Sequence, residues 1–243
     1  MIKYLFLAVL ACMSSGAAAA QKVSLPVEQI NSSMNMAQKR VREASVKVTT
    51  PGGGHGSGSY LVYKDAHLVL TAQHVADGIL GTQYHILKDN EVKLASLIWT
   101  DPEADMALLY LPERFVTIDP MKWNPQTKMA QVGTKTTYSG YPSSHKLMTF
   151  EGVVSGYADK TGVGKQIILN TYGWFGCSGS VIYTLSGEMV GVLYGVDVEY
   201  YPGVQVQENM IWVAPIQRLN IDVALNRMCK SLGMSKGRLR ACR

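Results

Sequence analysis

Short runs that alternate apolar and polar residues, or that are rich in apolar and β-branched residues, recur along the chain, and they predict β-strands rather than helices. Turn residues such as Gly52–Gly54 and Lys64–Asp65 separate the runs. The first set comprises Val46–Val48, Ser59–Tyr63, His67–Thr71, Tyr84–Leu87, Val92–Trp99 and Met106–Leu111. About six short strands are enough to close a small barrel, which we expect over about residues 46–115.

A second set of strands is predicted after a connector, Pro112–Lys128, which contains three prolines. Its runs are Lys135–Ser139, Leu147–Gly156, Gln166–Thr171, Ser180–Tyr183, Met189–Val196 and Met210–Val213. They predict a second barrel over about residues 128–217. The expected fold class is therefore all-β, with two six-stranded antiparallel β-barrels.

Helical periodicity occurs on either side of these strands. Apolar residues recur at spacings of three and four in Pro26–Ser45, which predicts a helix within residues 21–45, packed on the outside of the first barrel. A second helix is expected to open at Pro215 and to continue into a basic tail over residues 218–243. Its apolar positions are Ile216, Leu219, Ile221, Val223, Ala224 and Leu225.

The first twenty residues have the order of a secretory signal peptide. Lys3 gives a positive start, Tyr4–Met13 is apolar, and Ala18–Ala20 offers a small-residue cleavage site before Gln21. We therefore expect a secreted or periplasmic protein. A bacterial lipoprotein anchored through Cys12 ranks second, because residue 10 is not the usual small residue. No other segment is long enough to span a membrane.

Three cysteines remain if the signal peptide is removed: Cys177, Cys229 and Cys242. An exported compartment permits disulfides. Cys229 and Cys242 lie close together in the sequence and form the natural pair, worth roughly 3 kcal/mol in the chain-entropy treatment of a short loop. Cys177 is expected to stay free.

The formal net charge of +5 is concentrated at the C-terminus. From Arg218 onward, seven basic residues stand against Asp222 alone. Such a tail could contact an acidic surface, anionic lipid or nucleic acid, but a solvated end is the simpler interpretation. No aromatic residues alternate with the charges, so no nucleic-acid partner is expected. No spacing of Cys and His suggests zinc, and no metal or other cofactor is expected.

The candidate chemistry lies in three separated segments. Ser178 is flanked by Gly176 and Gly179, while His74 and Asp105 lie far upstream. A serine hydroxyl is a poor nucleophile unless a base removes its proton, and His74 is the candidate base with Asp105 as its partner. Gly176 permits a tight turn, so that the N–H groups of residues 176 and 178 converge on one oxyanion.

These residues carry a resemblance to the trypsin-like peptidase family, and most of all to its HtrA-type and glutamyl-endopeptidase-type branches. The similar segments run in family order from about residue 46 to 217: Gly56–Tyr60, Leu70–Val75, Asp101–Leu109, Gly140–Pro142 with Gly152–Gly156, and Gly176–Ser180. The resemblance implies a chymotrypsin-like fold and a serine endopeptidase that cleaves polypeptides through an acyl-enzyme. It places His74, Asp105 and Ser178 in the triad.

Several departures from the family pattern qualify this interpretation. Cys177 stands where trypsin has an aspartate, so trypsin-style zymogen activation is not expected. Only 26 residues follow Gln217, so no PDZ domain is expected. The competing assignments take Ser180 or Cys177 as the nucleophile. They also take Asp101 in place of Asp105 as the partner of the histidine. Each fits the family spacing less well.

By the same resemblance, the primary substrate pocket lies between residues 172–175 and 194–196. We expect Tyr172, Trp174, Phe175, Tyr194, Gly195 and Val196 to line it. Bulky side chains predict a narrow, apolar pocket. No histidine lies near Tyr194, which disfavours selectivity for glutamate, whereas Asp197 and Glu199 could attract a basic side chain.

Two other functions stay open from the sequence. The chain could be a catalytically inactive relative that serves as a binding module, although all three triad residues are present. It could also be an esterase with the same triad, but an α/β-hydrolase carries its triad in the order Ser, Asp, His. The oligomeric state is left open.

Overall fold

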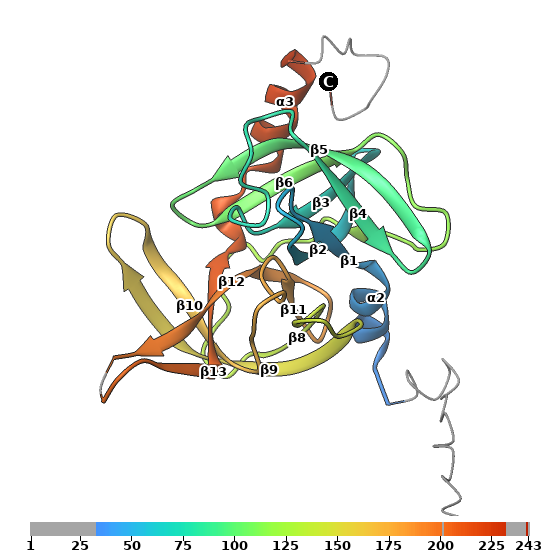
Figure 1. Ribbon diagram of the computed structural model, residues 1–243. Helices are drawn as coiled ribbons and strands as arrows, with labels where there is room; N and C mark the ends of the chain where they lie inside the picture. Colours follow the sequence, from blue (N-terminus) through green and yellow to red (C-terminus); the bar gives the residue numbers. More distant parts are fainter. Residues whose placement is uncertain (1–32, 201, 232–241, 243) are drawn as a thin grey trace, which may run out of the picture. The chain divides into compact units, whose positions relative to one another are not determined.

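The computed structural model describes residues 33–200, 202–231 and 242, which form two β-barrels with a helix before and a helix after them (Figure 1). The first barrel comprises β1 (Ser45–Thr49), β2 (His55–Tyr63), β3 (Ala66–Thr71), β4 (Gln83–Lys88), β5 (Glu91–Asp101) and β6 (Met106–Leu111). Their order is β1-β4-β5-β6-β3-β2, and pairing between β1 and β2 closes the ring. The two-residue strand β7 (Met121–Lys122) adds in parallel to β2.

The second barrel is a closed antiparallel ring. It comprises β8 (Lys135–Gly140), β9 (Met148–Lys160), β10 (Gly164–Asn170), β11 (Val181–Thr184), β12 (Met189–Glu199) and β13 (Gln205–Pro215). The order around the ring is β10-β13-β12-β11-β8-β9. The predicted fold class, two six-stranded barrels of the chymotrypsin-like type, is confirmed.

The alternation of side chains explains why these strands close into barrels. Successive residues of a strand point to opposite faces, so every second position can enter the barrel interior. Tyr60, Leu68, Leu70 and Leu108 are fully buried in the first barrel. Burying side chains of this kind stabilises the fold by about 1.5–3 kcal/mol each. The second barrel has its own buried cluster, which includes Tyr138, Ile182 and Val213.

The N-terminal helix α2 (Met36–Ala44) begins later than the sequence predicts. Asn35 caps it, because its side chain accepts from the Gln38 backbone while the Gln38 side chain accepts from the Asn35 backbone. This capping box defines the first turn. The earlier part of the predicted helix and the signal peptide lie outside the described residues.

Helix α2 contacts both barrels, not only the first as expected. Arg42 donates to Thr149 of β9 at 3.0 Å, and Gln38 donates to Glu151 of the same strand. From β4 of the first barrel, the Lys88 ammonium donates to the carbonyls of Arg42 and Ser45, each at 2.9 Å. The helix therefore braces the two barrels against each other.

The chain leaves the second barrel through a 3-10 turn, η1 (Ile216–Arg218), and then forms α3 (Ile221–Ser231). This helix packs on the first barrel, where Lys64 forms an ion pair of 2.7 Å with Asp222. Cys229 at the end of α3 is joined by a disulfide to Cys242, as predicted. Within the described residues, no helix has the length and apolar character needed to cross a membrane.

Candidate active site

His74 and Asp105 lie next to the adjoining ends of two neighbouring strands of the first barrel. His74 lies in the turn that follows β3, and Asp105 immediately precedes β6. Because Thr71 and Ala107 are paired across these strands, the two side chains meet. The imidazole Nδ1 lies 2.7 Å from Asp105 Oδ2, and the His74 backbone N–H donates to Oδ1 at 2.9 Å.

The environment of Asp105 favours its charged form. Burial by itself would raise the pKa of this carboxyl, but the hydrogen bonds from the imidazole and backbone of His74 lower the pKa below its usual value. Asp105 also has a left-handed backbone, with φ of 56°. A carboxylate fixed in this way holds the imidazole in one orientation and leaves Nε2 for a second partner.

Ser178 reaches the same place from the second barrel, on the loop between β10 and β11. A Cβ added to Gly56 would lie within 3 Å of both the Val75 side chain and the Ser178 carbonyl. A Cβ on Gly179 would meet Ser57 O and the backbone N of Ala72. The serine loop thus packs directly against the turn that carries His74, through contacts that only glycine permits.

Ser57 of β2 fastens the serine loop to the first barrel. Its N–H donates to Ser178 O at 2.7 Å, and its hydroxyl donates to Gly176 O at 2.7 Å. The same hydroxyl accepts the N–H of Tyr141 at 2.9 Å. Ser57 itself is fully buried, so its own atoms in these hydrogen bonds are shielded from water. In the sequence, this serine stands within the glycine-serine run Gly56–Tyr60, which predicts no role for it by itself.

The peptide groups of the serine loop have an arrangement that suits an oxyanion hole. Gly176 has φ of 89°, and a Cβ there would lie 2.3 Å from Tyr141 O. The carbonyl of Phe175 accepts from Ser143 N–H at 2.7 Å, and in a trans peptide the N–H of Gly176 therefore points the opposite way. Within the described residues, neither this N–H nor that of Ser178 donates a hydrogen bond to the protein.

The hydroxyl of Ser178 forms no hydrogen bond with any described residue, His74 included. Catalytic hydrogen bonds are often long in ligand-free enzymes and shorten when substrate binds. His74 and Asp105 are therefore hydrogen-bonded, and the backbone of Ser178 lies beside the turn that carries His74. The Ser178 hydroxyl and the His74 imidazole are not hydrogen-bonded to each other.

The competing assignments from the sequence fit the geometry less well. Cys177 is a free, fully buried cysteine, and burial raises the pKa of its thiol, which disfavours the reactive thiolate. Ser180 is also fully buried. Asp101 forms an ion pair with Arg218 at 2.8 Å and accepts from Ala104 N–H, so it is engaged elsewhere.

Among the residues expected to line the primary pocket, Val196 packs closely beside Gly173, whereas the space next to Gly195 is open. A Cβ on Gly173 would lie 2.3 Å from the Ile211 side chain and 3.3 Å from that of Val196. Tyr172 stacks on Phe150, whereas Phe175 is 78% exposed and points away from the core. Ile211 of β13 was not expected from the sequence. It pairs across the strands with Val196, which was expected to line the pocket, so this strand pairing was the signal that could have identified Ile211.

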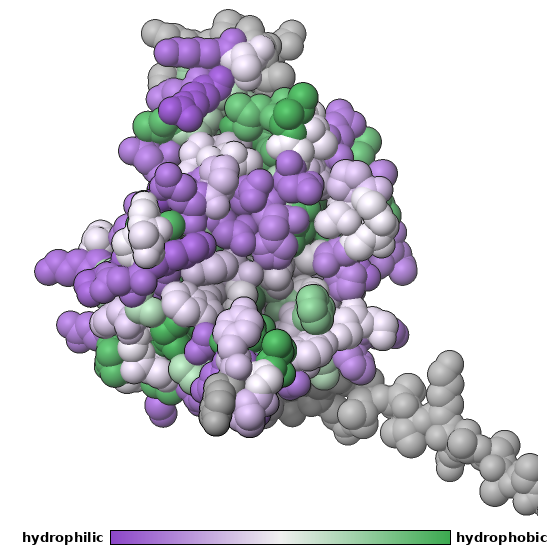
Figure 2. Space-filling view, turned by 60° about the vertical axis from the view of Figure 1, so that its left-hand side comes forward, coloured by the Kyte–Doolittle hydropathy of each residue, from purple (hydrophilic) through white to green (hydrophobic). Residues whose placement is uncertain are grey.

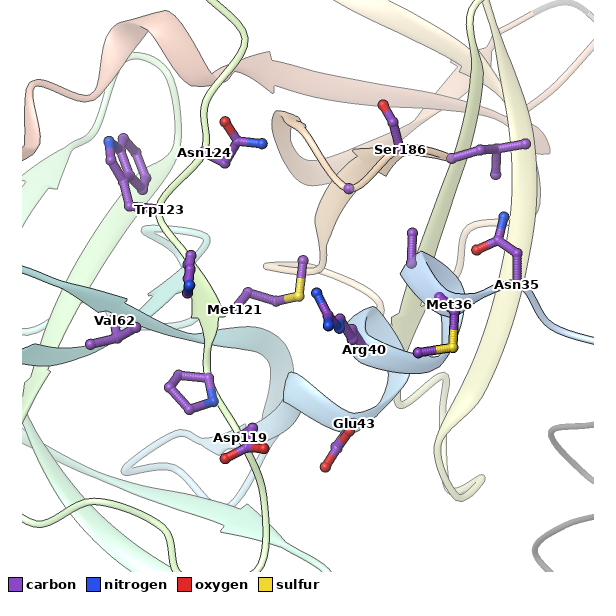
Figure 3. A pocket seen from close by; sticks show the side chains of 15 residues that line it. Asn35, Met36, Arg40, Glu43, Val62, Asp119, Met121, Trp123, Asn124 and Ser186 are labelled. Carbon is purple, nitrogen blue, oxygen red and sulfur yellow. The ribbon is translucent and has the colours of Figure 1, made fainter.

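A separate pocket of about 1080 Å³ lies between α2, residues 119–124 and the turn at 185–187. Side chains from α2 and from the connector face each other across it (Figure 3). None of the candidate catalytic residues lines it. Among the described residues, no group of three or more His, Cys, Asp or Glu side chains could hold a metal ion.

Comparisons with known proteins agree with this architecture. The sequence model of the trypsin-like peptidase domain matches residues 56–192, which is more than half of the chain and includes His74, Asp105 and Ser178. No protein with a curated description matches the sequence significantly.

Solved structures share the fold at low sequence identity. One is the Rv3671c protease of M. tuberculosis H37Rv, as a serine-to-alanine mutant in its inactive form. It has a TM-score of 0.60 and 17% identity, over 88% of this chain and 97% of that one. The active form of Rv3671c has a TM-score of 0.60 and 17% identity, over 80% of this chain and 84% of that one. The HtrA-type protease AlgW with a tripeptide has a TM-score of 0.62 and 19% identity, over 81% of this chain and 63% of that one. At such identities the likeness shows the fold alone.

Proposed function

The chain belongs to the trypsin-like peptidase family, and from this premise we propose that it is a serine endopeptidase with His74, Asp105 and Ser178 as its triad. The observation that carries the proposal is the pairing of His74 Nδ1 with Asp105 Oδ2 at 2.7 Å, beside a serine loop in which two N–H groups donate to no described residue. Family membership and the two-barrel fold support a protease. The assignment of the individual residues is ours.

In the proposed reaction, Ser178 Oγ attacks the carbonyl carbon of the peptide bond while His74 Nε2 takes the hydroxyl proton. Negative charge then develops on the former carbonyl oxygen, where the N–H groups of Gly176 and Ser178 stabilise it. His74 returns the proton to the leaving amine, which breaks the C–N bond and leaves an acyl-enzyme. A water molecule, activated by the same histidine, hydrolyses the ester and restores Ser178.

The proposed substrate is a polypeptide with a small apolar residue before the cleaved bond. Val196 and Ile211 fill the space next to Gly173, and both side chains are hydrocarbon. A long or charged side chain would be desolvated there without a partner, which is costly. The sequence also predicts a narrow, apolar pocket, and these two side chains support that part of the proposal.

We also propose that the protein acts outside the cytoplasm. The Cys229–Cys242 disulfide supports an oxidising compartment. The signal peptide proposed from the sequence would deliver the chain there by cleavage before Gln21.

One observation favours a second candidate, a catalytically inactive binding module: the Ser178 hydroxyl is not hydrogen-bonded to His74 in this structure. Labelling with a fluorophosphonate separates the two. A serine hydrolase is expected to react at Ser178, the Ser178→Ala variant should not react, and Cys177→Ala should react like the wild type. Wild-type protein that neither reacts nor cleaves a casein or peptide-library substrate would leave only the binding module.

A further inference from the structure

Arg218 links the end of the second barrel to the turn that presents Asp105. The residue ends η1, directly after β13. Its Nε and Nη2 donate to the same oxygen of Asp101, Oδ2, at 3.0 and 2.8 Å, and Nη2 lies 3.5 Å from Glu103. A guanidinium held at two nitrogens has a defined orientation, unlike the point contact of a lysine.

Asp101 and Asp105 occupy the two ends of one tight turn. Asp101 is paired with Met106 across β5 and β6, so only residues 102–105 connect the strands. The second oxygen of Asp101 accepts the N–H of Ala104 at 3.1 Å, inside the same turn. The turn ends in the left-handed backbone of Asp105, a conformation that a non-glycine residue adopts only when its surroundings hold it there.

Other parts of the second barrel contact the same turn. The Lys160 ammonium, at the tip of the β9–β10 hairpin, donates to Glu103 O at 3.3 Å and lies 5.0 Å above the Tyr194 ring. Arg218 also donates to Val163 O in that tip at 3.3 Å. Figure 2, which brings the side with this hairpin forward, shows hydrophilic residues gathered across the middle of the face.

We propose that Arg218 is a positioning residue for catalysis, which holds the Asp101–Asp105 turn against the second barrel and so aligns the His74–Asp105 pair with Ser178. The inference rests on the proposed function. Its physical basis is that His74 and Asp105 belong to one barrel and Ser178 to the other, so a small shift between them separates the hydroxyl from the imidazole. Misplacement by about 1 Å can cost on the order of 100-fold in rate.

The test measures kcat and KM for Arg218→Gln, which removes the charge but keeps a polar chain of similar length. We expect kcat to fall at least about tenfold with KM within about twofold, since the substrate pocket is untouched. The rate of fluorophosphonate labelling should fall by the same factor. Arg218→Lys, which keeps the charge but not the fork, should recover part of the loss. If Arg218→Gln fails to fold, the same measurements on Arg218→Lys test the proposal.

Lys64→Gln is the matched control, because it also breaks one ion pair to an aspartate, that with Asp222, away from the turn. Its kcat should equal that of the wild type. Asp101→Asn should lose as much as Arg218→Gln, and the double variant no more than either, because both release the same turn. An Arg218→Gln enzyme with wild-type kcat, or a loss that Lys64→Gln shares, would overturn the inference. Absence of wild-type activity would instead overturn the proposed function.

Discussion

The N–H of Ser57 donates a 2.7 Å hydrogen bond to the carbonyl of Ser178, which fastens the loop of the proposed nucleophile to the opposite barrel. The Ser57 hydroxyl makes a further hydrogen bond of 2.7 Å to Gly176 O. One residue of the first barrel thus holds two carbonyls of the loop, and the N–H groups left over are the ones suited to an oxyanion.

Replacing Ser57 by alanine should therefore loosen the serine loop. The variant keeps the backbone hydrogen bond but leaves the part-buried Gly176 O and Tyr141 N–H without their partner, at a cost of at most about 1–3 kcal/mol in the free energy of unfolding. We expect kcat to fall on the order of tenfold. Urea unfolding and steady-state kinetics measure the two effects. Ser155→Ala, an exposed serine of β9, is the control, and equal behaviour of the two variants would contradict the assigned role.

Removal of a proposed triad member should abolish peptidase activity. Ser178→Ala and His74→Ala are each expected to lower kcat/KM on the order of 10⁴-fold or more, because the triad acts as a unit. Asp105→Asn should be similarly severe, since it favours the wrong imidazole tautomer. Cleavage of one fluorogenic peptide measures all three. Cys177→Ala is the comparison. An inactive cysteine variant together with an active serine variant would make the enzyme a cysteine protease.

Widening the primary pocket should change the residue accepted before the cleaved bond. Val196→Ala removes two methyl groups, of which Cγ1 lies close to Gly173, and we expect preference to move from small toward larger apolar side chains in a peptide-library profile. Val198→Ala makes the identical change two residues along β12 and should leave the profile unaltered. An unchanged profile in Val196→Ala would show that the pocket lies elsewhere.

The disulfide should be the main covalent support of the C-terminal helix. Mass spectrometry of the unreduced, mature protein should find one free thiol, that of Cys177, and a bridge between Cys229 and Cys242. Reduction should lower the free energy of unfolding by roughly 3 kcal/mol. Two or more free thiols in protein purified from an exported fraction would be incompatible with this expectation.

The side chain of Lys88 should make the free energy of unfolding depend on pH in the alkaline range. The pKa of its ammonium is lowered to about 8, mainly by burial and to a lesser extent by nearby Arg42, while Asp89 and Glu43 oppose the shift. The folded protein then releases the proton at lower pH than the unfolded chain, so unfolding takes up a proton between pH 8 and the ordinary lysine value. Stability contributed by this group rises with pH in that window, by up to about 1.4 kcal/mol per pH unit.

Urea unfolding of the wild type and of Lys88→Met from pH 7.5 to 10.5 measures this contribution. The difference in free energy of unfolding between them should grow in favour of the wild type above pH 8. Parallel curves would mean that Lys88 titrates alike in both states.

Periodicity in the sequence was sufficient for the architecture, because strand alternation and turn residues are local signals. Each barrel strand was anticipated, with ends that differ by up to five residues, and the three separated segments around His74, Asp105 and Ser178 could be ordered along the chain. The start of α2 was misplaced because the predicted apolar pattern ran through Asn35, whereas the capping box of Asn35 and Gln38 decides where the helix begins.

Contacts between distant segments were decided only by the tertiary structure. Ser57 and Gly176 are 119 residues apart, Asp101 and Arg218 are 117 apart, and neither pair has a pattern of its own along the chain. The close approach of Ile211 to Gly173 likewise depends on how β12 and β13 pair. The sequence by itself determined which residue types could perform the chemistry. The packing of two closed barrels determined which backbone groups and charges hold those residues in place.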